Sequence, residues 1–543
     1  MAKTSSANSP LGIRQSPLPS VGLEGHAIRC NVLLMPLPRP FLCGLVLACL
    51  LAVNARAAAP NILLVIADDQ SWPHAGAYGD RTVQTPAFDR IAREGVLFTH
   101  GFCPAAQCSP SRAALLTGRN IWQLEEAGQM SSTFPPKFTT YTDVLRARGY
   151  HVGYTGKPWA PGDWKAGGRT TDPVGDEYNA KTLTPPSKFI SNLDYAENFR
   201  AFLARRPAGA PFHFWFGSNE PHRDYDLDSG VRSGKRTSDV KVPAYFPDDD
   251  VVRRDILDYK FEIDWFDRQL GRIMDVLRET GELENTLIIV TSDNGMPFDR
   301  AKASLYEGGT RIPLAIRWGA RIPAGRVVDD LVSLIDVAPT VLTATGLDLL
   351  PGTTGRSLLP LLTSTRTTEP DRDFVLLGKE RHNYARPDNL GYPTRAIRTR
   401  THLYIRNFKP DRWPIGDPPY YWCHTKMTNP TKDFVLRDPT APKLAYFYDL
   451  IYAKRPAEEL YDLTTDGDCI HNLATNARHA TVRQELSAKL DRLLLEQKDP
   501  RVLGEGDIFE SYPYFQKLPE QGFPGFFEYG KYNPKYMRPQ PRP

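Results

Sequence analysis

The stretch Asn61–Asp69 (NILLVIADD) sets the fold class of this 543-residue chain. Six consecutive apolar residues, Ile62–Ala67, show no alternation with polar residues, and two aspartates follow them directly. Such a run is typical of a strand that is buried on both faces, as in a parallel sheet covered by helices on both sides. We therefore predict a strand over Asn61–Ala67 whose carboxyl end carries Asp68 and Asp69.

The same pattern, an apolar strand that ends in polar residues, recurs along the chain. The further strands are predicted over His151–Thr155, Phe212–Gly217 and Thr286–Ser292. Helical patterns separate them, over Thr85–Glu94, Tyr141–Arg148, Asp194–Arg205 and about Asp249 to Thr280. Alternating strands and helices predict an α/β fold with a large, mostly parallel sheet flanked by helices. Ligands of open α/β sheets bind at the carboxyl ends of the strands, so these strand ends predict the site.

A second region follows from about Pro351. Short strands are predicted over Phe374–Leu377, Arg395–Arg398, Leu403–Arg406 and Glu459–Leu463, and a helix over about Val482–Glu496. They predict a smaller C-terminal α+β domain with an antiparallel sheet. The predicted organisation is a leader with signal peptide over 1–59, a catalytic domain over 60–370, the C-terminal subdomain over 371–501 and a tail rich in proline and aromatic residues over 502–543.

The amino-terminal region has the pattern of a signal peptide. Arg39 precedes the apolar run Phe41–Val53, and Ala55-Arg56-Ala57 follows it. This order of a basic flank, an apolar region and an A-x-A site predicts export to the periplasm or the medium, with translation starting at Met35. The run is too short to span a bilayer, and we expect no stable membrane span. The net charge of +4 is too slight to indicate a nucleic-acid partner.

Cysteine usage does not indicate a disulfide scaffold. Removal of the signal peptide would leave four cysteines. If Cys108 is chemically modified, at most one disulfide can form. These four are Cys103, Cys108, Cys423 and Cys469.

The stretch Cys108–Arg119 (CSPSRAALLTGR) predicts an anion site. Pro110 suits the first position of a helix, which would place Cys108 at the helix mouth, where free N–H groups favour anions. Arg112 would lie one turn into that helix. A structural cysteine and a thiolate phosphatase are both compatible with this pattern. The usual phosphatase loop, however, has its arginine six residues after the cysteine, where this chain has Ala114.

The same stretch resembles the signature of the sulfatase family, C-x-P-S-R followed by L-T-G-R. The resemblance extends from Pro60 to about Leu473, with further family-like segments at Tyr306–Pro313, Asp336–Thr340, Glu459–Leu463 and Asn472–Ala474. It implies that a maturation enzyme oxidises Cys108 to Cα-formylglycine. One hydroxyl of the hydrated aldehyde would attack sulfur, and the second would expel sulfate.

Two strand ends supply a set of oxygen ligands: Asp68, Asp69, Asp293 and Asn294. Such a set suits a hard divalent cation, and calcium tolerates irregular geometry better than magnesium does. The resemblance implies a calcium ion held by these residues beside the modified Cys108.

The resemblance also implies roles for the remaining site residues. Arg112 would hold the diol, and Lys157 and Lys302 would neutralise sulfate oxygens. His222 would protonate the leaving atom. The sequence departs from the family at Trp159, where G-K-x-H would have a histidine. Tryptophan cannot accept a proton, so a different group must act as base, or the chain is a non-catalytic glycan-binding member.

Gly295–Phe298 and Asn219–Arg223 look most like the heparan N-sulfatase (sulfamidase) branch. That likeness implies a sulfated sugar or a glycosaminoglycan-like substrate, with O-sulfate and N-sulfate both open. A phosphonate or phosphodiester hydrolase of the same superfamily is the alternative enzyme. Substrate contacts are predicted in the second domain for Glu380, Arg381, His382, Arg395 and Trp413.

Overall fold

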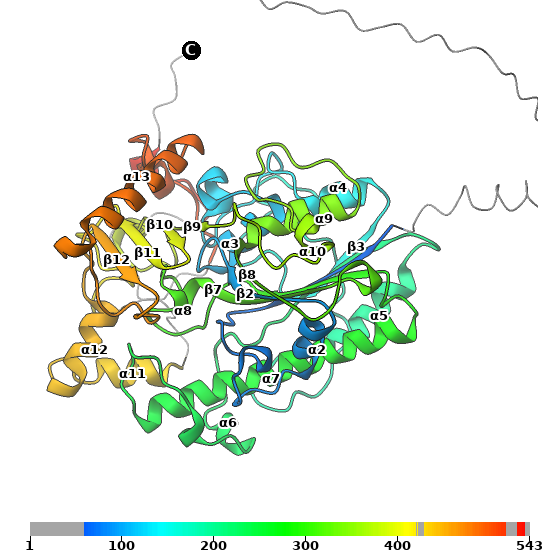
Figure 1. The fold of residues 1–543 in the computed structure, drawn as a ribbon, viewed down its shortest axis with the longest axis horizontal. Coiled ribbons are helices and arrows are strands. Elements are labelled where there is room, and N and C mark those ends of the chain that lie inside the picture. Colours follow the sequence, from blue (N-terminus) through cyan, green and yellow to red (C-terminus); the bar gives the residue numbers. More distant parts are fainter. Residues whose placement is uncertain (1–58, 420, 422–427, 517–528, 538–543) are drawn as a thin grey trace, which may run out of the picture. The chain divides into compact units, whose positions relative to one another are not determined.

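A sheet of eight strands, in the order β4-β3-β5-β1-β6-β7-β2-β8, carries the predicted site residues (Figure 1). Only β7 runs against the others, because it pairs antiparallel with both β6 and β2. The predicted large, mostly parallel sheet is therefore confirmed. The strands are β1 (Asn61–Ala67), β2 (Val96–Phe102), β3 (His151–Gly156), β4 (Asp176–Glu177), β5 (Phe212–Gly217), β6 (Thr286–Ser292), β7 (Arg311–Arg317) and β8 (Arg326–Ser333).

The computed structural model describes residues 59–419, 421, 428–516 and 529–537. The described residues belong to one compact unit that begins at Ala59. The predicted signal peptide lies outside them. No helix in the described ranges is long and apolar enough to cross a membrane.

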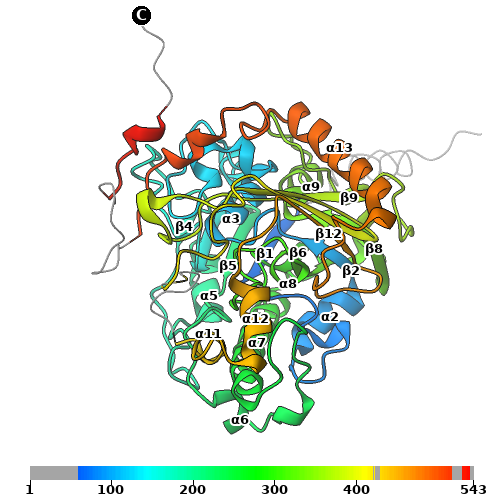
Figure 2. The ribbon, with the colours of Figure 1, turned by 90° about the vertical axis from the view of Figure 1, so that its left-hand side faces the viewer.

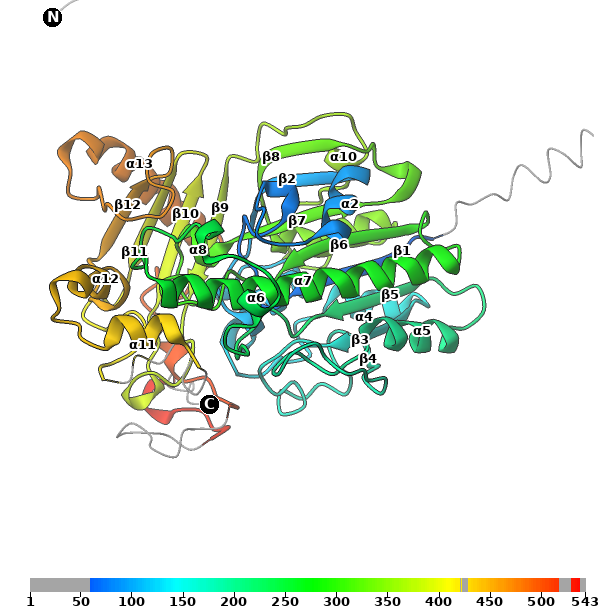
Figure 3. The same cartoon turned by 90° about the horizontal axis from the view of Figure 1, so that it is seen from below.

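Helices cover both faces of the large sheet (Figures 1 and 3). Side chains of β1 alternate between the two cores: Ile62, Leu64 and Ile66 face one core, whereas Leu63, Val65 and Ala67 face the other. This division explains why the strand is apolar throughout. One face carries α3 (Cys108–Thr117), α4 (Tyr141–Ala147), α9 (Val337–Ala344) and α10 (Leu359–Leu362), and the other carries α2 (Pro86–Glu94), α5 (Tyr195–Arg205) and α7 (Asp250–Glu279).

The second sheet is antiparallel, in the order β12-β11-β10-β9, as predicted (Figure 2). Its strands are β9 (Phe374–Lys379), β10 (Thr394–Thr399), β11 (His402–Asn407) and β12 (Glu458–Asp462). The helix α13 (Ala480–Glu496) packs against β10 and β11. The remaining helices are α6 (Ser229–Arg232), α8 (Glu307–Thr310), α11 (Pro430–Leu436) and α12 (Pro442–Tyr452), of which α11 packs against α7.

From its composition, the carboxyl-terminal tail is expected to wrap on the surface, but part of its described segment is buried. Phe509, Tyr512 and Tyr514 are buried, and the first two belong to the core beneath the large sheet. Their aromatic rings explain the difference, because each buries a large apolar area. Among the cysteines, Cys103, Cys108 and Cys469 are buried free thiols, and Cys423 lies outside the described residues.

Candidate active site

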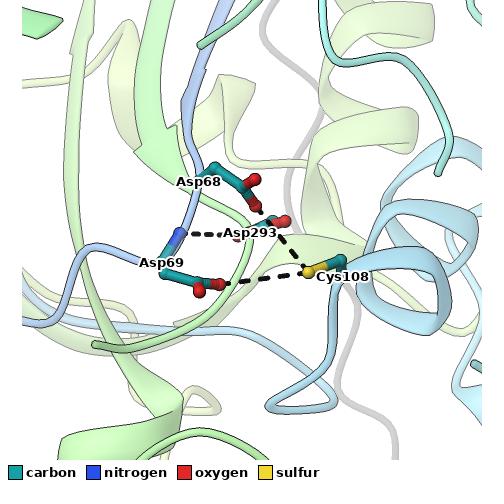
Figure 4. Close-up of side chains that lie close together, drawn as sticks. All are labelled: Asp68, Asp69, Cys108 and Asp293. Atoms are coloured by element: carbon teal, nitrogen blue, oxygen red, sulfur yellow. Dashed lines mark hydrogen bonds between the residues drawn. The ribbon is translucent and has the colours of Figure 1, made fainter. Parts of the chain in front are cut away.

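The four strands predicted to end in site residues are neighbours in the sheet, in the order β3-β5-β1-β6. Because β3, β5 and β6 all run parallel to β1, their carboxyl ends meet at one edge. Asp68, Asp69 and Asp293 come together there with Cys108, with ligand atoms within 4.8 Å of one another (Figure 4). All four side chains are buried.

The cysteine lies within contact distance of the two aspartates after β1. Its Sγ is 3.7 Å from Asp68 Oδ1 and 3.9 Å from Asp69 Oδ1. The backbone N–H of Asp69 donates to Asp293 Oδ1 at 3.1 Å, which joins the ends of β1 and β6. Asp69 has a φ of 78°, a left-handed conformation that few residues other than glycine adopt. Strain of this kind is typical of functional sites, and here it occurs in a predicted metal ligand.

The helix that carries the cysteine begins two positions earlier than predicted, because Pro110 was expected to be its first residue. Cys108 is its first residue, Gln107 is the N-cap and Pro110 is the third residue. Proline is tolerated there because the N–H groups of the first turn have no partner within the helix. The consequence for Cys108 is unchanged, since its side chain still lies at the helix mouth.

Three cations surround the carboxylates. Arg112 is fully buried, and its Nε donates to Asp293 Oδ2 at 2.9 Å. Lys157 Nζ lies 2.6 Å from Asp68 Oδ2, and Lys302 Nζ lies 2.5 Å from Asp69 Oδ2. The structure thus brings all three cations next to the carboxylates at the strand ends.

A pair of glycines positions Lys157. Gly156 has a φ of 78°, and a Cβ on it would lie 1.9 Å from the carbonyl oxygen of Gly217. Only glycine fits here, because β3 and β5 end in close backbone contact. The N–H of Lys157 then donates to Gly217 O at 2.7 Å, which turns the lysine toward Asp68.

The charged groups of the site shift one another's pKa values. Burial raises the pKa of Asp68, but the positive charge of Lys157 opposes this effect, and the net result is a lowered pKa of about 2. Burial lowers the pKa of Lys302, but Asp69 outweighs it, and the net shift is upward. The pair of Lys157 and Asp68 is therefore charged on both sides at neutral pH. Burial and the neighbouring carboxylates raise the pKa of the Cys108 thiol to about 12, although Lys157 and Lys302 oppose this shift.

His222 faces the same cluster from the loop after β5. Its Nδ1 lies 2.6 Å from the carbonyl oxygen of Arg223, so Nδ1 is the protonated nitrogen and donates there. Its Nε2 lies 3.8 Å from Asp69 Oδ2. Burial and Lys302 lower the pKa of His222, which favours the neutral ring. Arg223 anchors the loop through two hydrogen bonds of 2.7 Å to Asp255.

Trp159 has a packing role in the structure. Its side chain is 1% exposed, and its ring lies 5.2 Å from that of Phe134. Its indole Nε1 donates to the carbonyl oxygen of Ser109 at 3.0 Å. The residue at the family's histidine position thus braces the first turn of α3.

The residues predicted to contact substrate differ from one another in the groups that they contact. Arg395 and Glu380 are buried and paired at 2.7 Å, and Arg395 also binds Asp499. These contacts favour a structural role for both. Arg381 donates to the carbonyl oxygens of Tyr512 and Pro513.

His382 and Trp413 complete that set. His382 Nδ1 lies 3.1 Å from the side-chain nitrogen of Gln107, the residue before the cysteine. Trp413 is partly buried, and its ring lies 6.4 Å from that of Tyr421. His382 is thus joined to the nucleophile helix through Gln107. Sequence reasoning missed Gln107, and only its position before Cys108 could have indicated it.

The site fits a hard divalent cation. The side-chain nitrogen of Asn294 donates to Asp69 Oδ1 at 2.7 Å, which fixes the orientation of the amide. Its Oδ1 is buried and has no hydrogen-bond partner in the described part of the chain. Three carboxylates and this amide oxygen supply the oxygen donors that calcium prefers.

Comparisons with known proteins agree on one family. The sulfatase family matches residues 60–347, and the family described as N-sulphoglucosamine sulphohydrolase, C-terminal, matches residues 297–417. Human N-sulphoglucosamine sulphohydrolase is 29% identical, over 88% of this chain and 97% of its own length. An ulvan-active sulfatase of Formosa agariphila is 26% identical, over 83% of this chain and 77% of its own length.

A solved structure shares the fold. It contains its substrate D-glucosamine-2-N,6-O-disulfate, has a TM-score of 0.60 and 20% identity, and covers 81% of this chain and 98% of its own.

Proposed function

Because the chain belongs to the sulfatase family, we propose that it removes sulfate from a sulfated glycan, with calcium as cofactor and a Cα-formylglycine derived from Cys108. The chain is a sulfuric ester hydrolase, in keeping with its relatives. The observation that carries the proposal is the buried cluster of Asp68, Asp69, Asp293 and Cys108.

The net charge of the buried side chains at the site is compatible with a divalent cation and an anionic substrate bound together. Three carboxylates and three cations leave the cluster of buried charges neutral. A divalent cation would leave an excess of positive charge in a buried site, and that excess favours a sulfate group. Asp68, Asp69, Asp293 and the Oδ1 of Asn294 would hold the calcium, which would supply charge to the sulfate oxygens.

Without a metal ion, the surroundings of Cys108 favour the thiol over the thiolate that a thiolate phosphatase needs. With a pKa of about 12, its thiol is protonated at neutral pH and is a weak nucleophile. Oxidation to the aldehyde would replace it with a hydrate that has two hydroxyl groups, one for attack and one for release of sulfate.

The other residues act on charge and on protons. Lys157 and Lys302 would bind sulfate oxygens, and Arg112 would hold the hydroxyl groups at the helix mouth. The lone pair of His222 Nε2 faces the cluster, because the proton is on Nδ1. His222 is therefore the group placed to exchange a proton with the leaving atom.

We propose a substrate with sulfated amino-sugar units. The match to N-sulphoglucosamine sulphohydrolase extends over 97% of that protein's length. The match to its C-terminal family, over residues 297–417, includes strands β9, β10 and β11 of the second sheet. His382, joined to Cys108 through Gln107, is the substrate contact with the best support from geometry. The predicted signal peptide supports export, and a formylglycine-generating enzyme is the partner required for maturation.

The test uses native protein. Sulfate release is measured on O-sulfated and N-sulfated mono- and disaccharides, with a phosphonate and a phosphodiester as competing substrates. The mass of the Cys108 peptide is measured on the same sample. We expect sulfate release with an aldehyde at Cys108, and loss of activity in Cys108→Ala. Active enzyme with only unmodified cysteine would contradict the nucleophile, and faster turnover of phospho-substrates would favour the alternative hydrolase.

A further inference from the structure

A cavity of about 1150 Å³ lies beside the proposed calcium site, between the loop after β1, helix α8 and the β12 end of the second sheet. Ser71 and Met296 line it, and each lies two residues beyond a proposed calcium ligand. The N–H of Met296 donates to Ser71 Oγ, and Ser71 Oγ donates to the carbonyl oxygen of Gly308. These bonds join the lining of the cavity to the two loops that carry proposed calcium ligands. We call this cavity the basic cleft.

The basic cleft has more cationic than acidic side chains. Seven Lys and Arg residues and four Asp and Glu residues line it, a net charge of +3. Several of these charges are paired: Lys260 with Asp80, Arg236 with Asp239, and both Arg398 and Arg311 with Glu307. Arg400 is neutralised by Asp329 and Asp330, which lie outside the lining.

Arg81 and Lys241 differ from these paired cations. Both side chains are exposed, and neither forms an ion pair within the described part of the chain. Unpaired, accessible cations on a cavity wall are groups that an anionic ligand can bind without breaking an existing pair. They leave the cleft with uncompensated positive charge.

Part of the cleft lining is aromatic, and its arginines are held by contacts with neighbouring side chains. The guanidinium of Arg311 lies 3.5 Å from the ring centre of Trp72, and the ring of Tyr78 meets Trp72 edge-on at 5.9 Å. Arg398 binds Glu307 through two hydrogen bonds of 3.0 and 3.1 Å. Burial, together with Arg311 and Arg398, lowers the pKa of His100 to about 4, so this histidine is neutral. Positive charge and aromatic surface thus occur in one cavity.

We propose that the basic cleft binds saccharide units that carry sulfate or carboxylate groups, at a site separate from the site of hydrolysis. This inference rests on the proposed function, since it assigns a second contact for the same class of glycan. The volume exceeds the roughly 300–1,000 Å³ of ordinary small-molecule sites, so the cleft suits an oligosaccharide segment better than a free ion. Arg81 and Lys241 would bind its anionic groups, and Trp72, Tyr78 and Tyr245 would contact its rings.

The direct test measures binding of a size-defined heparin hexasaccharide by calorimetry. The full chain is used with Cys108→Ala, so that the probe is not cleaved. Arg81→Ala/Lys241→Ala is expected to weaken binding about ten-fold, because two charge-assisted contacts are lost. Lys241→Glu is expected to weaken it as well, and binding should weaken as salt increases.

The matched control is Arg93→Ala/Arg148→Ala. Both arginines are exposed, and they lie three residues before β2 and β3, at the opposite edge of the sheet. The control should keep the affinity of the parent protein. Equal affinity in the cleft variant and its parent, or equal loss in the control, would overturn the inference.

Hydrolysis separates this inference from the proposed function. With Cys108 intact, Arg81→Ala/Lys241→Ala should leave kcat/KM for a sulfated monosaccharide unchanged and lower it for the hexasaccharide. If no substrate is hydrolysed but the hexasaccharide binds through Arg81 and Lys241, the proposed function fails and the cleft stands. If hydrolysis is normal and the cleft variant binds the hexasaccharide as its parent does, the inference about the cleft is rejected and the proposed function is not.

Discussion

The indole Nε1 of Trp159 donates a hydrogen bond of 3.0 Å to the carbonyl oxygen of Ser109, the second residue of the helix that begins at Cys108. Trp159 follows Lys157 by two residues, so this bond ties the lysine loop to the start of the nucleophile helix. Arg112 adds a second tie, because its Nη1 donates to the carbonyl oxygens of Lys157 and Pro158. Trp159 replaces the histidine of the family motif, and in this structure it ties the lysine loop to the start of α3.

Substitutions of Trp159 should separate packing from chemistry. Trp159→Ala removes a fully buried ring and should lower the free energy of unfolding by about 3–5 kcal/mol. Trp159→Phe keeps most of the packing and loses one hydrogen bond, at a cost of about 1 kcal/mol. The Phe variant should retain most of the rate of sulfate release. In the Ala variant the start of α3 should shift, which should lower that rate by up to about 100-fold. Denaturant unfolding and sulfate release would be measured on both. A stable Phe variant without activity would assign the indole to the chemistry instead.

Calcium should stabilise the native protein. A ligand that binds only the folded state adds about 2.7 kcal/mol when it is present at 100 times its Kd. Chelation should therefore lower the melting temperature and abolish sulfate release, and added Ca²⁺ should restore both. Calorimetry with and without chelator makes the measurement.

A substitution of Asn294 tests whether its side-chain amide is one of the calcium ligands. Asn294→Ala removes the unpartnered Oδ1 and should weaken calcium binding by at least about ten-fold. Asn285→Ala is the control, because Asn285 immediately precedes β6 while Asn294 follows the same strand by two residues. Unchanged calcium affinity in Asn294→Ala would remove the amide from the ligand set.

Lys157 should matter more for the reaction than for the fold. Lys157→Gln removes the ammonium that lies 2.6 Å from Asp68, and the pKa of that carboxyl should rise from about 2. Loss of one charge directed at the sulfate oxygens should lower kcat/KM by about 10²–10³-fold. Lys165→Gln, at an exposed position of the following loop, is the control and should leave kcat/KM unchanged. A Lys157→Gln enzyme with normal kcat/KM would show that the lysine only pairs with Asp68.

The sequence predicted the elements that build the site because their signals are local. Residues 61–67, 212–217 and 286–292 are rich in apolar residues, and each forms the predicted strand with the predicted bounds. The sequence did not predict β2, β4, β7 or β8. β7 contains Pro313 between two arginines, and β8 is an edge strand that contains Arg326, Asp329 and Asp330, so neither has the apolar pattern of a central strand.

The contacts that the sequence did not indicate join residues far apart in the chain. From the sequence, Arg395 and Glu380 were predicted to contact a glycan. In the structure they form a buried network of ion pairs with Asp499 and Arg501, which lie about 100 residues further along the chain. Trp159 shows the same limit, because its partner Ser109 lies on another element. Buried pairing of this kind depends on tertiary packing, which no local motif specifies.

His213 gives a test of acid stability that does not involve the active site. It is fully buried in β5, with its Nε2 2.9 Å from the hydroxyl of Tyr141, and burial lowers its pKa from the usual 6.5 to about 3. Between these two values the unfolded chain binds a proton that the native protein does not. Stability from this group is therefore fully present above pH 6.5 and decreases as the pH falls.

His213→Gln removes that titration and keeps a polar partner for Tyr141. Between pH 7 and pH 5 the free energy of unfolding should decrease by about 2 kcal/mol less in this variant than in the parent, because one pKa unit corresponds to about 1.4 kcal/mol. Urea unfolding at the two pH values measures the difference, and His471→Gln, at an exposed position, should behave as the parent. An identical pH dependence in His213→Gln and the parent would mean that the ring is protonated within the native sheet.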